Sequence, residues 1–390
     1  MKIAIVHDYL YQFGGAEKCV EKWLEMYPNA DVYTSFVIPQ KFVNSESITK
    51  AYQENRIKTT ILQRLFNIKF FLKFQKHLFF VYPIVFSFWK VKNYDKVILS
   101  STFCAKNIQF QDCRKIFFYC HTPTRFLHNL TSKEDHQSVN WLLQKIMAFL
   151  VFWLKKIDLK AADNLKKLGV IFIANSKFVQ KNILEIYKTE SKVIYPPVKI
   201  EHFLAIKREK QEFLNQNSYL YFGRISFHKR LDLVILACLK LGRKLKIAGA
   251  ASLDLELKAL QKIVSDFEVK NPEKKGLVEF LGRVSDKKRD ELMANSRAFL
   301  FPTKEDFGIV SIEVFASGMP IIAYKAGGSL EYVKPNQNGI FFEEQTVESL
   351  MTAILKFETQ KNWDIKTIKS SSQDFSDQIF SQKIQEVLQI

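Results

Sequence analysis

Short apolar runs alternate with helical patterns along the whole chain, and this alternation constrains the fold more than any other feature. It predicts an α/β fold in which parallel strands are joined by crossover helices. Strands are expected at residues 3–6, 97–100, 115–119 and 170–174 in the first half, and at 219–222, 244–248, 278–281, 298–301 and 320–324 in the second. Each half therefore indicates a doubly wound domain of its own.

Two consecutive prolines, Pro196 and Pro197, separate the two series of strands. Neither a helix nor a central strand continues through such a pair, so a stiff extended hinge is expected there. The predicted N-terminal domain is 1–198 and the predicted C-terminal domain is 199–370. A last amphipathic segment, 371–390, is expected to pack back on the N-terminal domain.

Composition excludes several classes of protein. Hydrophobic residues make up 47% of the 390 residues and charged residues 25%, which is typical of a globular chain. The five cysteines contain no C-x-x-C pair, which favours buried, reduced thiols. The first eight residues lack the apolar stretch of a signal peptide, and no apolar run approaches the roughly 20 residues of a spanning helix. A cytoplasmic protein is expected.

Positive charge is concentrated in the first half. Residues 1–198 hold 29 basic and 15 acidic groups, within a net charge of +18 for the chain. Residues 57–92 are rich in Phe, and helical spacing would place Lys69, Lys73 and Lys76 on one stripe, with Phe66, Phe70 and Phe74 on the next. This predicts a segment that meets an anionic membrane, and a core helix with a solvated lysine face is the alternative. The apolar run 141–157 indicates core or lipid contact. No nucleic-acid motif is present.

Three further patterns follow predicted strands and carry chemistry. Gly14 and Gly15 precede a helix expected to begin near Glu17, which would let backbone N–H groups approach an anion, although a plain tight turn explains the pair equally well. Arg224 and Lys229 lie just beyond another strand, where two cations suit neighbouring phosphates. The sequence contains no Asp-x-Asp string, which is the pattern expected where a metal ion binds together with a diphosphate.

The most informative segment runs from residue 301 to residue 320. Glu305 follows a predicted strand, and Glu313 lies eight residues later in a helix expected to start near Ile309. Carboxylates at a strand's carboxyl end can accept hydrogen bonds from sugar hydroxyls.

Together these motifs resemble those of a known family. Gly-Gly-Ala-Glu at 14–17, Asn-Ser-Lys-Phe-Val at 175–179, Tyr-Pro-Pro-Val at 195–198, Leu-Gly-Arg-Val at 281–284 and the residues above occur in the order typical of retaining GT-B glycosyltransferases of family 4, group 1. The chain is most similar to bacterial mannosyltransferase-like enzymes of O-antigen and capsule assembly. The resemblance implies two Rossmann-like domains that face each other across a cleft.

The resemblance also implies roles for matched residues. His121, Arg224, Lys229 and Glu305 would be catalytic, with His121 facing the transferred sugar. The nucleotide sugar would be bound by residues from both domains: Gly14, Gly15, Arg224, Lys229, Val284, Phe307, Gly308, Ile309, Val310 and Glu313. Two departures bear on donor geometry, because Ala250 and Ala251 follow Gly249 where a second glycine is common, and Ser311-Ile312 precedes Glu313 where proline is frequent.

The implied reaction moves a hexose from a nucleotide diphosphate to a lipid-linked saccharide with retention of configuration, in lipopolysaccharide or other surface-polysaccharide synthesis. Residues 304–310 favour GDP-mannose, and neither a metal nor another cofactor is expected. The enzyme would lie on the inner face of the membrane. Two alternatives stay open, namely a non-hydrolysing nucleotide-sugar epimerase and a non-catalytic membrane or nucleic-acid binding protein.

Overall fold

The chain divides into two compact units. The computed structural model describes residues 1–68, 71, 75–128, 130, 141–208, 218–251, 253–360 and 363–389. Unit 1 is Met1–Pro197 together with Gln378–Ile390, and unit 2 is Val198–Asp377. The division lies one residue from the boundary expected at 198. The last segment differs from the expectation, because residues 371–377 belong to unit 2 and only Gln378–Ile390 joins unit 1.

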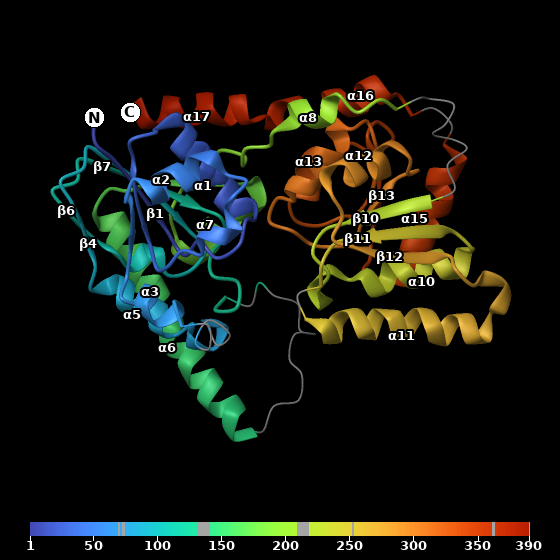
Figure 1. Cartoon of the computed structure of the whole chain (residues 1–390), viewed down its shortest axis with the longest axis horizontal. Helices are drawn as coiled ribbons and strands as arrows, with labels where there is room; N and C mark the ends of the chain where they lie inside the picture. The colour runs from blue at the N-terminus through green and yellow to red at the C-terminus, as the bar shows by residue number, and fades with distance from the viewer. Residues whose placement is uncertain are drawn as a thin grey trace. The chain divides into compact units, whose positions relative to one another are not determined.

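Unit 1 is built on a seven-stranded parallel sheet with the order β3-β2-β1-β5-β7-β8-β9 (Figure 1). The sheet grows from β1 in both directions, so its topological switch point lies between β1 and β5. A small parallel pair, β4 (Lys90–Lys92) with β6 (Gln109–Gln111), lies outside it. The strands of the large sheet are β1 (Ile3–His7), β2 (Asp31–Thr34), β3 (Ile57–Thr59), β5 (Lys96–Ser101), β7 (Lys115–Cys120), β8 (Ile171–Ala174) and β9 (Lys192–Val193).

Both faces of this sheet are buried. Ala4 and Val6 of β1 enter one hydrophobic cluster, whereas Ile3 and Ile5 enter another. Successive side chains of a strand point to opposite faces, so an unbroken apolar strand requires helices on both sides. Those helices are α1 (Gly15–Met26), α2 (Glu46–Gln53), α3 (Leu62–Phe66), α5 (Val81–Ser87), α6 (Trp141–Lys167), α7 (Lys177–Tyr187) and α17 (Asp377–Gln389).

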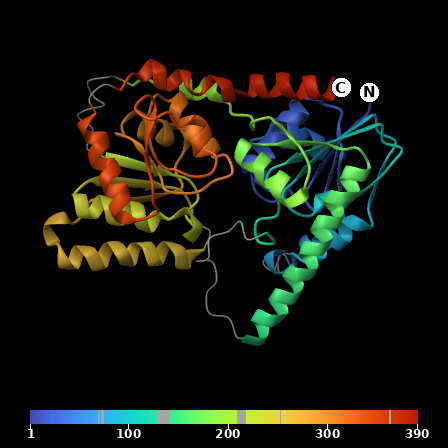
Figure 2. The same ribbon diagram turned by 180° about the vertical axis from the view of Figure 1, so that it is seen from behind.

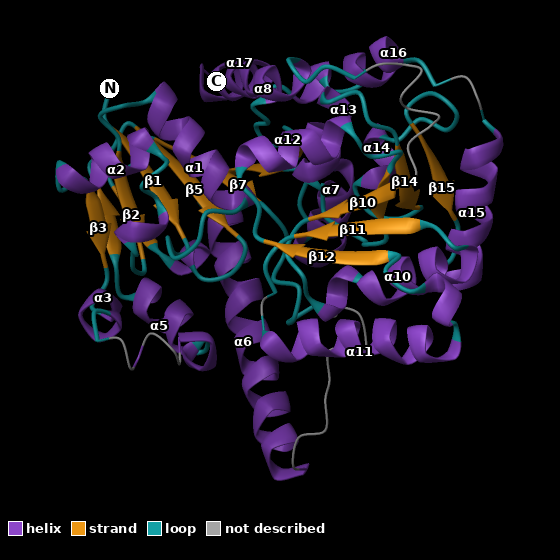
Figure 3. Ribbon diagram, turned by 45° about the vertical axis from the view of Figure 1, so that its right-hand side comes forward, coloured by secondary structure: helices purple, strands orange, loops and turns teal. Residues whose placement is uncertain are grey.

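Unit 2 repeats the plan with six parallel strands in the order β12-β11-β10-β13-β14-β15 (Figure 3). Its switch point lies between β10 and β13. The strands are β10 (Ser218–Phe222), β11 (Lys244–Ala248), β12 (Val278–Gly282), β13 (Phe299–Phe301), β14 (Ile321–Tyr324) and β15 (Gly339–Phe342). The helices are α8 (Ile200–Leu204), α10 (Leu231–Leu241), α11 (Asp254–Lys270), α12 (Asp286–Ala294), α13 (Ile309–Ala316), α14 (Ser329–Tyr332), α15 (Val347–Thr359) and α16 (Ile365–Ser370).

All nine expected strands are present, each with ends within one residue of the prediction. The basic aromatic segment differs from the prediction. Residues 57–59 form β3, and Phe66 is 4% exposed because it packs against Phe36 with ring centroids 4.7 Å apart. The core alternative therefore holds for Phe66. Lys69, Lys73, Phe70 and Phe74, together with the side chain of Lys76, lie outside the described residues.

Two expectations about the chain as a whole can be compared with the described residues. No disulfide joins the five cysteines, and all but the partly buried Cys113 are buried. Among the described helices, none combines the length and the apolar character that a bilayer crossing requires.

Helix α17 completes the core of unit 1. Phe380, which is 2% exposed, lies against the rings of Trp23 and Tyr119 with both centroid distances at 6.1 Å. Ile384, Val387 and Leu388 enter the same cluster. The Phe380→Ala variant leaves a cavity there and should cost about 3–5 kcal/mol of unfolding free energy.

Urea unfolding followed by tryptophan fluorescence measures this cost. The Phe380→Leu variant is the control and should lose much less, because it keeps most of the apolar volume. A loss near zero for Phe380→Ala would contradict the role given to α17.

Candidate functional site

A buried carboxylate organises the strand ends at the switch point of unit 1. Asp8 follows β1, and its oxygens accept hydrogen bonds from the Ser101 and Thr102 hydroxyls at 2.7 and 2.9 Å. The backbone N–H groups of residues 102–105 also donate to it, at 2.7–3.1 Å. Burial raises the pKa of Asp8, but His7 and these hydrogen bonds outweigh it, and the pKa is lowered. The turn after β5 is thus held against the end of β1.

The predicted glycine pair lies at the start of α1. This helix begins at Gly15, two residues before the expected Glu17. Glu17 is buried and accepts the backbone N–H of Gly14 at 3.0 Å, so the glycine loop is closed by a capping carboxylate. Gly14 is half-buried and Gly15 is exposed, which leaves their backbone accessible at a helix N-terminus.

His121 lies immediately after β7 and is 7% exposed. Its Nε2 is 2.8 Å from the Ser100 Oγ, and its ring lies edge-to-face against Tyr119 at 5.1 Å. Burial, together with neighbouring His7, lowers the pKa of His121 to about 3 against a smaller opposing effect of Asp8. The ring is neutral over the physiological range.

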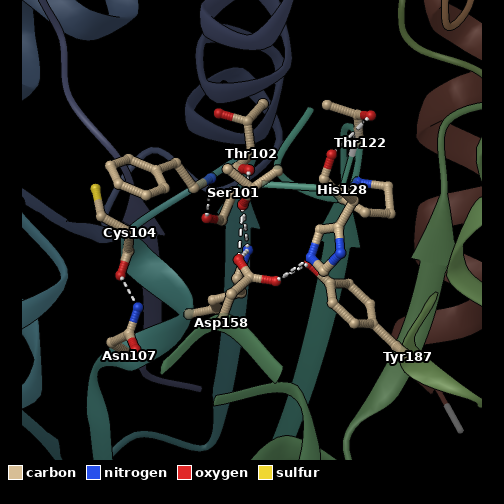
Figure 4. Close-up of polar contacts among 12 residues, drawn as sticks. Ser101, Thr102, Cys104, Asn107, Thr122, His128, Asp158 and Tyr187 are labelled. Carbon is tan, nitrogen blue, oxygen red and sulfur yellow. Dashed lines mark hydrogen bonds and ion pairs between the residues drawn. The ribbon is translucent and has the colours of Figure 1, made fainter. Parts of the chain in front are cut away.

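The segment after His121 is anchored by a second buried carboxylate, Asp158 of α6 (Figure 4). Asp158 accepts hydrogen bonds from Thr124 at 2.7 Å and Tyr187 at 3.0 Å, and its Oδ2 is 2.9 Å from the His128 Nε2. The Lys106 ammonium, 2% exposed, lies 2.6 Å from its other oxygen. Sequence reasoning missed this cluster, because its members are scattered over some 80 residues.

In unit 2 the predicted cations follow β10. Arg224 is exposed, and Lys229 ends the short turn Phe227–Lys229. Lys229 forms an ion pair with Glu305, which follows β13, and both side chains are about four-fifths buried. The fold thus brings two of the predicted residues into direct contact at the switch point. A cation and a hydroxyl acceptor stand together where an open α/β sheet binds its ligand.

Glu256, which the sequence analysis did not predict, supports the loop between Arg224 and Lys229. Glu256 of α11 is 7% exposed and accepts the backbone N–H of Phe227 at 3.2 Å. Its second oxygen accepts the N–H of Leu253 at 3.0 Å. The loop between Arg224 and Lys229 is therefore tied to the start of α11.

The Glu305 loop is held on its other side by close backbone packing. Gly308 has φ of +94°, which a residue with a side chain rarely adopts, and it caps α13. A Cβ at Gly328 would lie 2.5 Å from the Phe307 backbone, and the Gly328 N–H donates to the Glu305 carbonyl at 2.9 Å. Residue 328 must be glycine for this approach. In the sequence, the pair Gly327-Gly328 alone was too weak a signal to predict this close approach.

The remaining predicted residues are distributed around this loop. Phe307 is buried against Tyr332 and Phe375, both with centroids 5.6 Å away. Ile309 and Val310 form the half-buried first turn of α13, and Glu313 is 6% exposed one turn further on. Val284 is half-buried after β12, at the edge of the sheet. The described residues contain no group of three His, Cys, Asp or Glu side chains that could hold a metal ion.

Comparison with known proteins decides the family of unit 2. Residues 202–374 match the family described as Glycosyl transferases group 1. This part of the chain is a group 1 glycosyltransferase domain. The match spans β10–β15 and includes Arg224, Lys229, Glu305 and Glu313, so the cation and carboxylate motifs lie within the glycosyltransferase domain.

Relatives and a solved structure extend the similarity to the whole chain. The chain is 24% identical over 381 residues to the alpha-1,3/1,6-mannosyltransferase ALG2 of Kluyveromyces lactis, covering 85% of this chain and 71% of that protein. It is 25% identical over 232 residues to the human GDP-Man:Man(3)GlcNAc(2)-PP-Dol alpha-1,2-mannosyltransferase, covering 54% and 46%. The crystal structure of Anabaena HepE in complex with UDP covers both chains fully, with a TM-score of 0.65 and 20% identity. The predicted GT-B fold is confirmed.

The Asp158 cluster predicts how the stability of unit 1 depends on pH in the acid range. Burial raises the pKa of this carboxyl, but Lys106 and the hydrogen bonds of His128, Lys106 and Thr124 outweigh it, and the pKa falls from 3.8 to about 2. A lowered folded-state pKa stabilises the protein above the unfolded value, by about 2 kcal/mol here, and this contribution is lost as pH falls from about 4 to about 2. Asp158→Asn leaves Lys106 uncompensated and should cost about 3–5 kcal/mol.

Urea unfolding between pH 2.5 and pH 7 tests both statements. The Asn variant should be less stable at pH 7 and should lose less on acidification than the wild type. Asp163→Asn, which removes an exposed carboxylate from the same helix, is the matched control and should behave as the wild type. Equal acid dependence in wild type and Asp158→Asn would show that the cluster contributes nothing in this window.

Proposed function

We propose that the chain is a retaining hexosyltransferase that moves mannose from GDP-mannose to a lipid-linked saccharide, in the synthesis of a surface polysaccharide such as O-antigen or capsule. The transfer uses no metal ion and no other cofactor. Unit 2 binds the nucleotide sugar and unit 1 the acceptor. The observation that carries the proposal is the contact between Lys229 and Glu305, beside Arg224, at the switch point of a group 1 glycosyltransferase domain.

The chemistry of transfer accounts for this pairing. Cleavage of the sugar–phosphate bond leaves negative charge on the diphosphate, which Arg224 and Lys229 stabilise as fixed cations. Glu305 accepts hydrogen bonds from hydroxyls of the transferred hexose, and the backbone at Phe307 and Gly308 supports it. Glu313 accepts those of the ribose. Lys229 and Glu305 neutralise each other before the substrate arrives, so neither charge is left unpaired in a largely buried place.

The remaining roles follow the same logic. Gly14 and Gly15 lie against the diphosphate from unit 1, and His121 faces the hexose. None of these side chains is placed as an obvious nucleophile. Retention of configuration then follows from attack on the face that the diphosphate leaves, with a phosphate oxygen taking the acceptor's proton and the cations stabilising the departing charge.

The choice of mannose and GDP is supported by the names of the relatives. ALG2 is named as a mannosyltransferase, and the human relative is named for a GDP-Man donor and a PP-Dol acceptor. UDP is the alternative nucleotide of the donor, because the HepE crystal structure is a complex with UDP. The alignment spans 46% of the human relative.

Helix α6 supports a location on the membrane surface. Figure 2 shows its N-terminal half extending beyond the strands of unit 1. Phe149, Phe152 and Trp153 are 68%, 57% and 41% exposed, and with Lys145 and Lys156 they follow a spacing of three and four residues. The Lys156 ammonium lies 4.4 Å from the Phe152 ring centroid. The stripe is aromatic and basic, and residues 141–157 contain no acidic residue.

Such a stripe suits the inner leaflet of a membrane. Aromatic rings enter the boundary between headgroups and acyl chains, and lysines reach the anionic headgroups. The predicted role of Lys69, Lys73 and Lys76 stays a part of this proposal, since their side chains lie outside the described residues. The enzyme would then meet a lipid-linked acceptor at the surface where that acceptor resides.

Donor binding gives the first test. Thermal unfolding is measured with GDP, UDP, ADP and their sugar conjugates, because a ligand bound only by the native state raises the midpoint. GDP and GDP-mannose should raise it selectively, with EDTA making no difference. Selective stabilisation by UDP would replace the donor, and conversion of free donor without acceptor would favour the epimerase. If no nucleotide raises the midpoint, the proposal that the chain is a glycosyltransferase is contradicted.

Arg224→Ala tests the cation role. Loss of one or two charge-assisted hydrogen bonds should weaken GDP affinity about 10- to 100-fold, as measured by calorimetry, and lower turnover severely. Because Arg224 is exposed, the midpoint of the ligand-free protein should stay unchanged. Lys356→Ala, which removes an exposed cation of α15, is the matched control. Near-normal affinity and turnover in Arg224→Ala would exclude its assigned role.

Vesicle binding tests the α6 stripe. The double variant Phe152→Glu, Trp153→Glu should lose sedimentation with vesicles that contain phosphatidylglycerol, while its unfolding midpoint stays near that of the wild type. Leu355→Glu, at a 46% exposed position of α15, is the control. Undiminished binding by the double variant would rule out α6 as the membrane contact.

A further inference from the structure

A row of buried polar side chains leads from α1 to His121. The Glu17 Oε1 lies 3.9 Å from the His7 Nε2, and the His7 Nδ1 lies 3.0 Å from the Ser100 Oγ. The Ser100 Oγ is in turn 2.8 Å from the His121 Nε2. All four side chains are buried, between 0% and 7% exposed.

The parallel sheet brings these residues together. His7 is the last residue of β1, and Ser100 is its register partner on the neighbouring strand β5. His121 follows β7, the next strand, and Glu17 lies in the first turn of α1. The four residues come from four segments that are up to 114 positions apart, and the rings of His7 and His121 meet edge-to-face at 6.3 Å.

Counting protons restricts what the row can be. The Ser100 hydroxyl lies between two imidazole nitrogens and has one proton, so it donates to one of them and accepts from the other. One of the two facing nitrogens must therefore be an N–H. The tautomers of His7 and His121 are coupled through this single hydroxyl.

Glu17 decides between the two arrangements. Its carboxylate favours a proton on the His7 Nε2, and when the ring carries that single proton its Nδ1 is bare. Ser100 then donates to His7 and accepts from an Nε2–H of His121. The Nδ1 of His121 is left as a lone-pair acceptor, and within the described residues no hydrogen bond joins it to another group.

We propose that Glu17, His7 and Ser100 are positioning residues that hold His121 as the Nε2–H tautomer, so that its Nδ1 accepts a hydrogen bond from a hydroxyl group of the sugar substrate. This inference rests on the proposed function for the identity of the ligand. It goes beyond that function, because it fixes which ring nitrogen meets the sugar and which residues select it.

The surroundings of the row support this assignment. The lowered pKa of His121 keeps the ring neutral, and only a neutral ring offers an acceptor. Glu17 also accepts the N–H of Gly14 through its other oxygen at 3.0 Å, so the row begins at the glycine loop assigned to the diphosphate. Asp8, the neighbour of His7, is occupied by the turn after β5. The acidic group facing the His7 Nε2 is therefore Glu17.

Nuclear magnetic resonance of the full chain with ¹⁵N-labelled histidine tests the tautomer without any substrate. Long-range ¹H–¹⁵N spectra distinguish a protonated from a bare ring nitrogen, and a His121→Gln variant assigns the signal among the seven histidines. The expected result is a protonated Nε2 and a bare Nδ1 in His121. A protonated Nδ1 would overturn the proposal, whatever the activity of the protein.

Substitution of Ser100 tests the consequence for transfer. Ser100→Ala should lose the single tautomer and lower kcat about tenfold, with KM for the nucleotide sugar little changed. Ser100→Thr keeps the hydroxyl and should restore both the spectrum and most of kcat. Ser45→Ala is the matched control, because it removes a buried hydroxyl of unit 1 that has no hydrogen-bond partner among the described residues.

The two readouts separate the inference from the proposed function. Wild-type kcat in Ser100→Ala, or an unchanged His121 spectrum in that variant, would overturn the positioning role and leave the transferase intact. Absence of transfer from any nucleotide sugar would overturn the proposed function, while the predicted spectrum would still support the row of side chains from Glu17 to His121.

Discussion

The Asp8 carboxylate is the constraint on which unit 1 depends. A charge on a residue that is only 2% exposed is tolerated only because two hydroxyls and four backbone N–H groups surround it. Those donors all belong to residues 101–105, so the carboxylate fixes the end of β5 against the end of β1. Ser100 and His7 are the residues just before this clamp, and their alignment toward His121 follows from it.

Unit 2 also fixes the loops at its strand ends, but through different contacts. There the loops after β10 and β13 are joined by the Lys229–Glu305 ion pair and are held from outside by Glu256 and by the close approach of Gly328. One unit uses a buried charge with backbone donors, and the other uses opposite charges that a ligand can separate. The second arrangement suits a site in which the cation and the carboxylate would both bind a substrate.

Sequence reasoning succeeded where a signal is local and apolar. The nine expected strands are short, mainly apolar runs, and the cation and carboxylate motifs directly follow two of them. It failed for β2 and β3, which are short and mix polar residues with apolar ones. For Phe66 it left a membrane-facing stripe and a core helix both open, and tertiary contacts decide for the core. The row from Glu17 to His121 and the Asp158 cluster could not be foreseen, because only the register of a folded sheet makes neighbours of residues nearly a hundred positions apart.

The course of the chain has a consequence for how the protein is made. Residues 1–197 and 378–390 share one core, and all of unit 2 is encoded between them. During synthesis unit 1 therefore waits with Trp23 and Tyr119 uncovered while some 180 further residues emerge, and unit 2 can finish folding first. A ribosome that stalls late leaves a complete unit 2 attached to a unit 1 with an open apolar face, and such a product invites chaperone binding or aggregation.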